Sequence, residues 1–395
     1  MAWLLVVLSL VYTIPFLAFS IGHYRIFQWN DPAGPGRLRS LLAFLLGFSP
    51  KQLSAGAILA KLTSIPKIPS ISVIIAARNE EKYVGDCLRS LTNQSIPLEI
   101  ILVDDGSEDD TIAVVKSFGD AVTLIHLEFG QGKKAAIEVG VLAASGDIML
   151  FTDADSTVLP TWAETLRKEF TEEVAFVAGP VVFDSGPRFF DRIVALEWTG
   201  LMGIAAGAIG IGIPLNCSGA NIGYRKSVFN EVQGFKGLAH LSSGDDELMM
   251  QRIASKTKWK VVFTTSREAI VTTKAPQTVK EFMSQRIRWA SKGAYYSRKW
   301  HVAMNLGFWL YYVSIPVAGL ASIWVPELRM AFFAGLGMKI VAELSLLAQS
   351  TSFYDRKALM RDYVWALPFQ IVYVLWAGAA GFFGNYEWKS RRLER

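Results

Sequence analysis

The chain has 395 residues, of which 51% are hydrophobic and only 19% are charged. This composition is too apolar for an ordinary soluble protein and indicates membrane segments around one soluble domain of roughly 200–250 residues. The net charge of +5 excludes a nucleic-acid signature, because basic residues beside membrane segments explain so small an excess. The two cysteines, Cys87 and Cys217, have neither a disulfide nor a zinc spacing, and both fit a reduced domain that faces the cytosol.

The N-terminal segment, residues 1–24, is long enough to span a membrane and contains no Lys, Arg, Asp or Glu. The first charged residue is Arg25. Because a secretory signal carries its positive charge before the apolar stretch, we interpret this segment as a retained anchor with Arg25 in the cytosol. Within residues 25–70, short apolar runs alternate with Lys51 and Lys61, which is typical of an interfacial connector or of a plain linker.

From residue 71 onward the sequence alternates between strand and helix patterns. Short apolar runs rich in β-branched residues predict strands at 71–77, 98–103, 121–127 and 147–151. Amphipathic patterns between them predict helices at 79–91, 109–118 and 133–144. The alternation indicates an α/β domain over residues 71–300 with a mostly parallel, doubly wound sheet. In such sheets, ligands bind beyond the carboxyl ends of the strands.

The C-terminal region, residues 301–386, contains about three further apolar segments. They lie at 302–326, 330–350 and 363–386. Lys339 and Glu343 interrupt the middle segment, and as an i,i+4 pair they can partly neutralise each other if they face other helices. The first and third segments are uncharged and long enough to span.

The topology that these segments predict contains a conflict. One N-terminal and three C-terminal spans put the tail, residues 387–395, outside, whereas its basic residues favour the cytosol. Either one C-terminal segment is interfacial or re-entrant, or the tail breaks the charge rule. Residues 199–224 are also uncharged, but a span there would separate Asp246 and Trp289 from Asp153 across the membrane. We therefore expect a buried or surface-lying segment near the bilayer.

Acidic side chains follow three of the predicted strands. These strand ends carry Arg78-Asn79-Glu80, Asp104-Asp105, and Asp153 with Asp155. Acids gathered at one edge of a sheet repel each other unless a cation or basic groups offset their charge. Because residues i and i+2 of an extended chain point the same way, Asp153 and Asp155 can hold Mg²⁺ or Mn²⁺ together with substrate phosphates. The alternative is that these acids only cap a helix.

Two further motifs carry charge at predicted helix starts. Lys133 and Lys134 follow Gly132 at such a start, which favours an anion site or, alternatively, a solvated lysine pair. In "GDDE", Asp246 can serve as a general base if neighbouring acids raise its pKa, although acids at a helix N-terminus are also favourable without any catalytic role.

A third motif, "SQRIRWASKG", concentrates positive charge around one aromatic residue. Arg286, Arg288 and Lys292 lie around Trp289. Guanidinium groups bind phosphate oxygens in pairs, and an indole can pack on a sugar or a lipid. A basic helix beside the membrane is the alternative, since an apolar segment begins about ten residues later.

Taken in order, these motifs resemble those of the membrane-bound family 2 glycosyltransferases, such as cellulose synthases and ceramide glucosyltransferases. The motifs are "SVIIAARNEE", "ILVDDGSEDDT", "GKKAAIEVG", "TDADS", "SGDDELMMQRI" and "QRIRW". The resemblance covers about residues 70–300 and implies a GT-A glycosyltransferase domain with flanking transmembrane helices. Two residues depart from the family pattern: Glu138, where Asn is frequent, and Asp245, where Glu is frequent.

The resemblance implies a role for each matching residue. For binding of the nucleotide sugar it implies Arg78, Glu80, Asp104, Asp105, Lys133 and Asp153, and for the metal it implies Asp153 and Asp155. For catalysis it implies Asp246 as the general base, with Gln285, Arg288 and Trp289 holding the diphosphate and framing the acceptor.

The activity that the resemblance implies is an inverting transfer from a nucleotide-diphosphate sugar, expected to be a UDP-sugar, with Mg²⁺ or Mn²⁺ as cofactor. Because the spans are few for a polymer-exporting channel, we favour a lipid acceptor at the cytosolic face over a processive polysaccharide synthase. A catalytically silent membrane scaffold is disfavoured, since all of the acids and the Arg-Trp pair are present together. The expected location is the bacterial inner membrane, with several spans, a cytosolic catalytic domain and no nucleic-acid partner.

Overall fold

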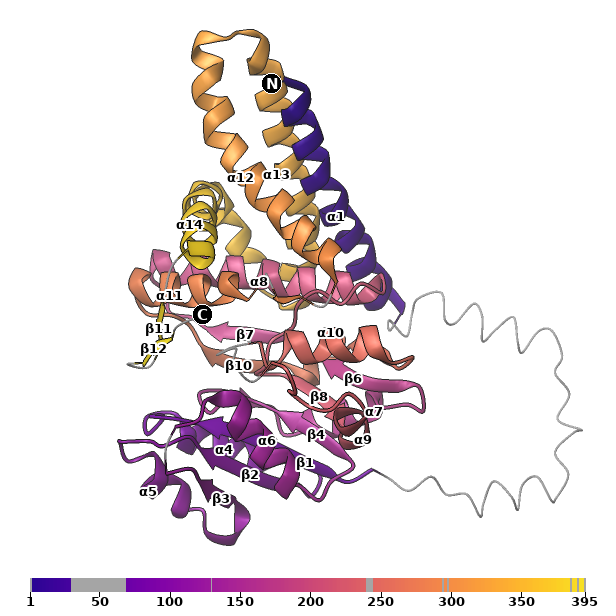
Figure 1. Ribbon diagram of the computed structural model, residues 1–395, viewed down its shortest axis with the longest axis vertical. Coiled ribbons are helices and arrows are strands. Elements are labelled where there is room, and N and C mark those ends of the chain that lie inside the picture. The colour runs from indigo at the N-terminus through magenta and orange to yellow at the C-terminus, as the bar shows by residue number, and fades with distance from the viewer. Residues whose placement is uncertain are drawn as a thin grey trace, which may run out of the picture.

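The computed structural model describes residues 2–29, 69–128, 130–238, 244–292, 295–296, 298–383, 386–388 and 391–393. Most of the connector predicted at residues 25–70 lies outside the described residues. Figure 1 shows an α/β domain in the lower half and a group of long helices in the upper half.

The α/β domain is built on a seven-stranded sheet with the order β3-β2-β1-β4-β8-β6-β9. Its strands are β1 (Ile71–Ala77), β2 (Glu99–Asp104), β3 (Thr123–His126), β4 (Ile148–Phe151), β6 (Val174–Ala178), β8 (Ile222–Arg225) and β9 (Lys260–Phe263). β1 pairs in parallel with β2 and β4, and only β8 runs antiparallel to its neighbours. The prediction of an α/β fold with a mostly parallel sheet is therefore confirmed.

The helices of the domain cover this sheet and position its edge. They are α4 (Val84–Thr92), α5 (Thr111–Lys116), α6 (Lys133–Ala143), α7 (Trp162–Glu169), α9 (Lys226–Glu231) and α10 (Glu247–Lys256), with 3₁₀ turns η2 (Gly119–Ala121) and η3 (Arg267–Ala269). α6 packs closely on β1, since a Cβ at Gly140 would lie 2.6 Å from Cγ2 of Ile74. The chain order reverses between β1 and β4, which is where ligands bind in doubly wound sheets.

A second, three-stranded sheet lies between the main sheet and the long helices. Its order is β5-β10-β7, with β5 at Thr157–Val158, β10 at Val271–Lys274 and β7 at Val181–Asp184. β7 and β10 lie directly below two horizontal helices in Figure 1, α8 (Phe189–Gly210) and α11 (Val279–Ser291). This layer connects the strand ends of the main sheet to the helices above them.

Five helical segments in the described part of the chain are long and apolar enough to cross a membrane. They belong to α1 (Ala2–Trp29), α8, α12 (Lys299–Trp324), α13 (Glu327–Phe353) and the stretch of η5 (Lys357–Asp362) and α14 (Tyr363–Phe383). In Figure 1, α1, α12 and α13 run side by side, whereas α8 and α11 cross below them and α14 is seen nearly along its axis. After α14, β11 (Tyr386–Trp388) and β12 (Arg391–Leu393) form an antiparallel pair.

The crossing of α8 beneath α1 and α13 depends on small residues. A Cβ at Gly207 would lie 2.2 Å from the carbonyl oxygen of Phe19, and one at Gly203 would lie 2.1 Å from Oγ of Ser350. Glycine lets the helices approach closely at these points.

The uncharged stretch at residues 199–224 is not one element. Helix α8 ends at Gly210, and the chain then leads into β8.

A buried polar cluster holds the long helices together. Lys339 and Glu343 of α13 form an ion pair, and the ammonium group of Lys339 also donates to Oε1 of Gln370 at 2.8 Å. The hydroxyl of Tyr363 donates to Oε2 of Glu343 at 2.8 Å, and the hydroxyl of Tyr12 donates to Oε1. The two charges therefore face other helices and neutralise each other, as the i,i+4 spacing predicts.

Candidate active site

A cavity of about 270 Å³ lies between the strand ends of the main sheet and helices α8, α10 and α11. The residues predicted from the sequence that line it are Arg78, Glu80, Asp105, Lys133, Asp153, Asp155, Asp246, Gln285, Arg288 and Trp289. Of the residues for which the resemblance implies a role, Asp104 alone is not among the lining residues. Motifs more than 200 positions apart in the chain thus meet at one edge of the sheet.

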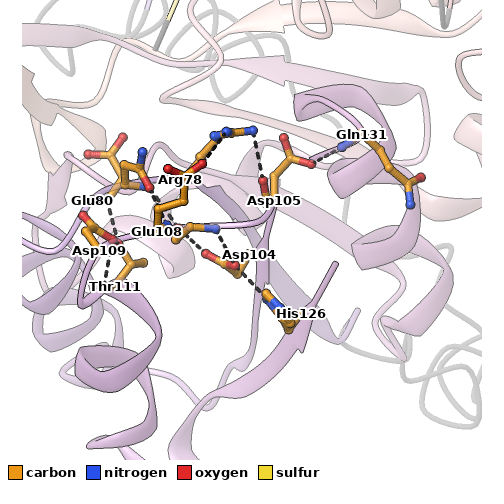
Figure 2. Close-up of polar contacts among 11 residues, drawn as sticks. Arg78, Glu80, Asp104, Asp105, Glu108, Asp109, Thr111, His126 and Gln131 are labelled. Atoms are coloured by element: carbon orange, nitrogen blue, oxygen red, sulfur yellow. Dashed lines mark hydrogen bonds and ion pairs between the residues drawn. The ribbon is translucent and has the colours of Figure 1, made fainter. Parts of the chain in front are cut away.

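The loops after β1 and β2 form one end of this cavity and are tied to each other (Figure 2). The Asp105 carboxylate accepts hydrogen bonds from the backbone N–H groups of Gln131, at 2.6 Å, and Gly132, at 3.0 Å. The backbone N–H of Glu80 donates to Oγ1 of Thr111 at 2.7 Å. Arg78 lies across the loop, with its guanidinium 3.6 Å from Glu108. These bonds fix the loops that surround the polar end of the cavity.

The resemblance implies that Asp104 binds the nucleotide sugar, but Asp104 does not line the cavity. Its side chain is fully buried and accepts hydrogen bonds from the backbone N–H of Ser107, at 3.0 Å, and from the Ser107 hydroxyl. Nδ1 of His126 lies 2.9 Å from the same carboxylate (Figure 2). Successive residues at the end of a strand point in opposite directions, so Asp104 and Asp105 cannot both face the cavity. Asp104 shapes the turn after β2 instead.

Asp153 and Asp155 follow β4 and both line the cavity. Lys133 lies 2.7 Å from Oδ1 of Asp153, and the hydroxyl of Thr273 donates to Oδ1 of Asp155 at 3.1 Å. Across the described ranges, no group of three or more His, Cys, Asp or Glu residues could hold a metal ion. Two carboxylates facing an open cavity still suit Mg²⁺ or Mn²⁺, because these ions take one or two protein carboxylates and complete their shell with substrate phosphates.

Lys133 is shared between two acids at the start of α6. Its ammonium group lies 2.7 Å from Asp153 and 3.3 Å from Asp245. Burial lowers the pKa of Lys133, but these two carboxylates outweigh that effect and raise the pKa above its ordinary value. Lys134 has a different environment: it donates to the carbonyl of Leu238 at 3.2 Å, and burial lowers its pKa to about 8. Only Lys133 of the lysine pair lines the cavity.

Asp246 caps the N-terminus of α10 and faces the cavity. Its Oδ1 accepts from the backbone N–H of Glu247 at 2.7 Å, and its Oδ2 accepts from the backbone N–H of Gly219 at 2.9 Å. Burial raises its pKa, but Lys292 and Lys133 outweigh burial and hold the pKa below its ordinary value. The expectation of a raised pKa is therefore wrong, because two lysines approach the acid and motif spacing shows only its acidic neighbours. The carboxylate is ionised at neutral pH and can accept a proton.

Glu247 is a buried acid that the sequence reasoning did not single out. Its Oε2 lies 3.3 Å from the ammonium group of Lys292 and accepts from the hydroxyl of Tyr296 at 3.1 Å. Burial raises its pKa to about 6. Lys292 lies near both Asp246 and Glu247. Together with Lys133 it outweighs the effect of burial on the pKa of Asp246, whereas burial dominates the pKa of Glu247.

Three aromatic rings, those of Phe183, Trp198 and Trp289, form the side of the cavity nearest the long helices. We call them the aromatic wall. Gln285, Arg288 and Trp289 lie on one face of α11, as their i, i+3, i+4 spacing predicts. The Trp289 ring lies 5.6 Å from that of Trp198 on α8, which stacks at 4.6 Å on Phe183 of β7. Phe183 and Trp198 also line the cavity, and no motif spacing could have found them because they belong to separate elements.

The fold and the cavity define a GT-A-like glycosyltransferase domain. Residues 72–233 match the family model described as glycosyl transferase family 2. An N-acetylglucosaminyltransferase of Rhizobium meliloti is 27% identical over 256 residues, which are 61% of this chain and 59% of that protein. The probable glycosyltransferase YdaM of Bacillus subtilis is 27% identical over 247 residues, 59% of this chain and 57% of that protein. Residues 72–233 of the chain are thus similar to glycosyl transferase family 2, and the comparisons support a glycosyltransferase.

The similarity to other proteins is partial in each case. The chain spans less than two thirds of the length of those two curated relatives. A 4,4'-diaponeurosporenoate glycosyltransferase of Staphylococcus aureus is 39% identical over 105 residues, 26% of this chain and 28% of that protein. Among solved structures, the mannosyltransferase PcManGT from Pyrobaculum calidifontis, in complex with GDP-Man and Mn²⁺, is 17% identical with a TM-score of 0.49. That alignment covers 95% of this chain and 98% of the mannosyltransferase chain.

Proposed function

We propose that the protein transfers a sugar from a UDP-sugar to a lipid acceptor at the cytosolic membrane face, with inversion at the anomeric carbon. The observation that carries this proposal is the cavity in which two strand-end acids, a helix-start lysine, the partly buried Asp246 and an Arg-Trp pair meet. A diphosphate requires cationic partners, and the acceptor hydroxyl requires a base. The names of the curated relatives, all glycosyltransferases, support the class of reaction.

Different parts of the cavity are assigned to different parts of the donor. Arg78, Glu80 and Asp105 surround the end in which the nucleoside is expected, and Lys133 and Arg288 supply positive charge for the diphosphate. Asp153 and Asp155 would hold Mg²⁺ or Mn²⁺, which when bound neutralises charge on the leaving diphosphate.

The transfer step uses Asp246 as the general base. The ionised carboxylate accepts the proton of the acceptor hydroxyl while the hydroxyl oxygen forms a bond to the anomeric carbon from the face opposite the diphosphate. The bond between that carbon and the diphosphate oxygen breaks, and its electron pair leaves with the diphosphate. A single displacement of this kind inverts the configuration. Arg288 stabilises the negative charge that develops on the leaving group.

A lipid acceptor is supported by where the aromatic wall lies. Phe183, Trp198 and Trp289 bound the cavity on the side of α8 and α11, directly below the group of long helices (Figure 1). Those helices expose many large apolar side chains, among them Trp3, Leu4, Val7, Ile14, Leu320, Ile323, Trp324, Met330 and Phe333. A bilayer around these helices would place the lipid headgroups at the level of the aromatic wall.

The same arrangement supports a topology with three crossings. We assign α1, α12 and α13 as spans, and α8 and α14 as helices that lie along the cytosolic surface (Figure 1). Three crossings put the N-terminus outside and the basic tail, residues 387–395, inside, in agreement with the positive-inside rule. This assignment replaces the expected third C-terminal span at residues 363–386 with a surface helix. A reporter protein that is active only in the cytosol should therefore be active when it is fused after residue 395.

The test of the proposed function is product analysis. Membranes that contain the protein are incubated with Mn²⁺ and radiolabelled UDP-sugars, with membranes of the Asp246→Asn variant as the control. A product that organic solvent extracts supports a lipid acceptor, and a high-molecular-weight product supports a polysaccharide synthase. If no label is transferred and UDP with Mn²⁺ does not raise the thermal stability of the protein, a silent scaffold is supported instead.

A further inference from the structure

Helix α11 carries buried residues next to those that line the cavity. Gln285, Arg288 and Trp289 line the cavity. Phe282 and Arg286 are buried on the adjoining side of the helix, against α14 and α8. The orientation of the cavity residues therefore depends on what holds the adjoining side of the same helix.

Arg286 is the centre of that buried side. Its side chain is only 5% exposed, and its guanidinium group donates to the carboxylate of Glu197 on α8, which is also 5% exposed. The same guanidinium donates to Oε1 of Gln285 at 2.5 Å and lies 4.4 Å from the centre of the Trp289 ring. On its other side it lies 4.3 Å from the ring of Phe282. One buried cation thus contacts two of the residues that line the cavity.

Glu197 extends this contact to α14. Its Oε1 accepts a hydrogen bond from the hydroxyl of Tyr373 on α14 at 2.6 Å. The Tyr373 ring lies 5.1 Å from that of Phe282, and a Cβ at Gly381 of α14 would lie 2.7 Å from Cβ of Ala290 on α11. α14 therefore contacts α11 at both Phe282 and Ala290, and Glu197 connects the two helices through α8.

We propose that Arg286, Glu197 and Tyr373 are positioning residues for the transfer reaction. They couple the position of α14 to the orientation of Gln285 and Trp289 in the cavity. Hydrogen bonds to charged groups are directional, and a buried charge that loses one partner cannot recover it from water. The proposal rests on the proposed function, because it assigns these residues to the acceptor side of that same cavity, away from the nucleoside end.

The variants that test this proposal are Glu197→Gln and Tyr373→Phe, each measured in lipid nanodiscs. Glu343→Gln is the matched control, since Glu343 is likewise a buried acid bound by a cation and a tyrosine, Lys339 and Tyr363, and both partners lie outside α11. For each protein we would measure kcat and KM for UDP-sugar per folded molecule, together with hydrogen exchange of residues 282–291.

We expect Glu197→Gln to lower kcat by about tenfold to a hundredfold, because small displacements of positioned groups are costly. Its KM for UDP-sugar should change less than its kcat, since Arg288 is the one residue of α11 assigned to the diphosphate and the nucleoside end is untouched. Exchange of residues 282–291 should accelerate in Glu197→Gln and, to a smaller extent, in Tyr373→Phe, but not in Glu343→Gln. Unchanged exchange in Glu197→Gln, or an equal loss of kcat in Glu343→Gln, overturns the proposal. If the wild-type protein transfers no sugar, the proposed function fails, while the exchange measurement still decides whether these residues position α11.

Discussion

The ammonium group of Lys292 lies 3.8 Å from Oδ1 of Asp246, at the wall of the cavity. Lys292 follows the last turn of α11, and Asp246 precedes the first turn of α10. The helix that presents Gln285 and Trp289 to the cavity therefore also controls the charge of the acid assigned as the base. The residues proposed to frame the acceptor and the residue proposed to activate it therefore depend on the same helix.

Replacing Asp246 with Asn should lower kcat by about a hundredfold to ten-thousandfold, since the acceptor hydroxyl loses its proton acceptor. Binding of UDP-sugar should remain, because Asn keeps the size of the side chain and can keep one of its two hydrogen bonds from backbone N–H groups. Steady-state kinetics and calorimetric titration with UDP separate the two effects. Asp120→Asn, at an exposed site in η2, is the control. Turnover near that of the wild type would disprove the assignment of Asp246.

Replacing Lys292 with Met should move the acid limb of the pH–rate profile to higher pH. In the wild-type protein, Lys292 and Lys133 hold the pKa of Asp246 below its ordinary value, so the acid stays ionised well into the acidic range. Without Lys292, burial dominates and the pKa of Asp246 rises. The profile of kcat/KM measures the change, and Lys292→Arg, which keeps the positive charge, should leave the limb nearly in place. An unmoved limb in Lys292→Met would show that another group controls it.

Glu247 should make stability depend on pH in the acidic range. Its pKa in the folded state, about 6, lies above its ordinary value of 4.5. A raised pKa contributes stability that is present below the unfolded value and is lost as the pH rises through the folded value. Across that window the free energy of unfolding should fall by about 2 kcal/mol. Thermal unfolding of Glu247→Gln should show a weaker fall, and an identical pH dependence would exclude Glu247 as its source.

Replacing Asp155 with Ala should abolish the metal-dependent part of nucleotide binding with little effect on folding. The Asp155 carboxylate lies next to Asp153, and without a cation the two acids repel each other. In thermal-shift experiments, UDP with Mn²⁺ should stabilise the wild-type protein more than UDP alone, whereas the variant should show no added effect of Mn²⁺. Asp86→Ala removes an exposed acid of α4 and should behave like the wild type.

Replacing Gly207 with Ala should destabilise the crossing of α8 and α1 by about 1–3 kcal/mol, because the added methyl group would meet the backbone of Phe19. Gly337→Ala is the matched control. Gly337 also lies within a long helix, but a Cβ there has no neighbour within 4 Å, so alanine should be neutral or stabilising by up to about 1 kcal/mol. Chemical unfolding in mild detergent compares the two variants, and equal stabilities would refute this packing account.

Much of the sheet could be predicted from sequence because its signals are local. The strand at residues 71–77 is a continuous run of buried apolar residues, and it forms β1 with those bounds. The sheet β5-β10-β7 could not be predicted, since its strands are two to four residues long and come from distant parts of the chain.

The candidate site likewise has features that the sequence predicts and features that it does not. Motif order predicts which acids and bases meet in one cavity, because parallel strands end at one edge. It does not predict which of Asp104 and Asp105 turns toward that cavity. It also does not predict that Trp198 extends the aromatic wall or that lysines lower the pKa of Asp246. These features depend on side-chain direction and on contacts between distant elements.

The two ends of the cavity rest on different supports. The end proposed for the nucleoside is held by hydrogen bonds within the α/β domain: the turn before α6 donates to Asp105, and the backbone N–H of Glu80 donates to Thr111. Two of the three rings of the aromatic wall, Trp198 and Trp289, belong to α8 and α11, which are held by α1, α13 and α14. Extraction from the membrane should therefore affect the two ends unequally: protein purified in a harsh detergent should still retain UDP on an affinity column after it has lost the ability to use an acceptor.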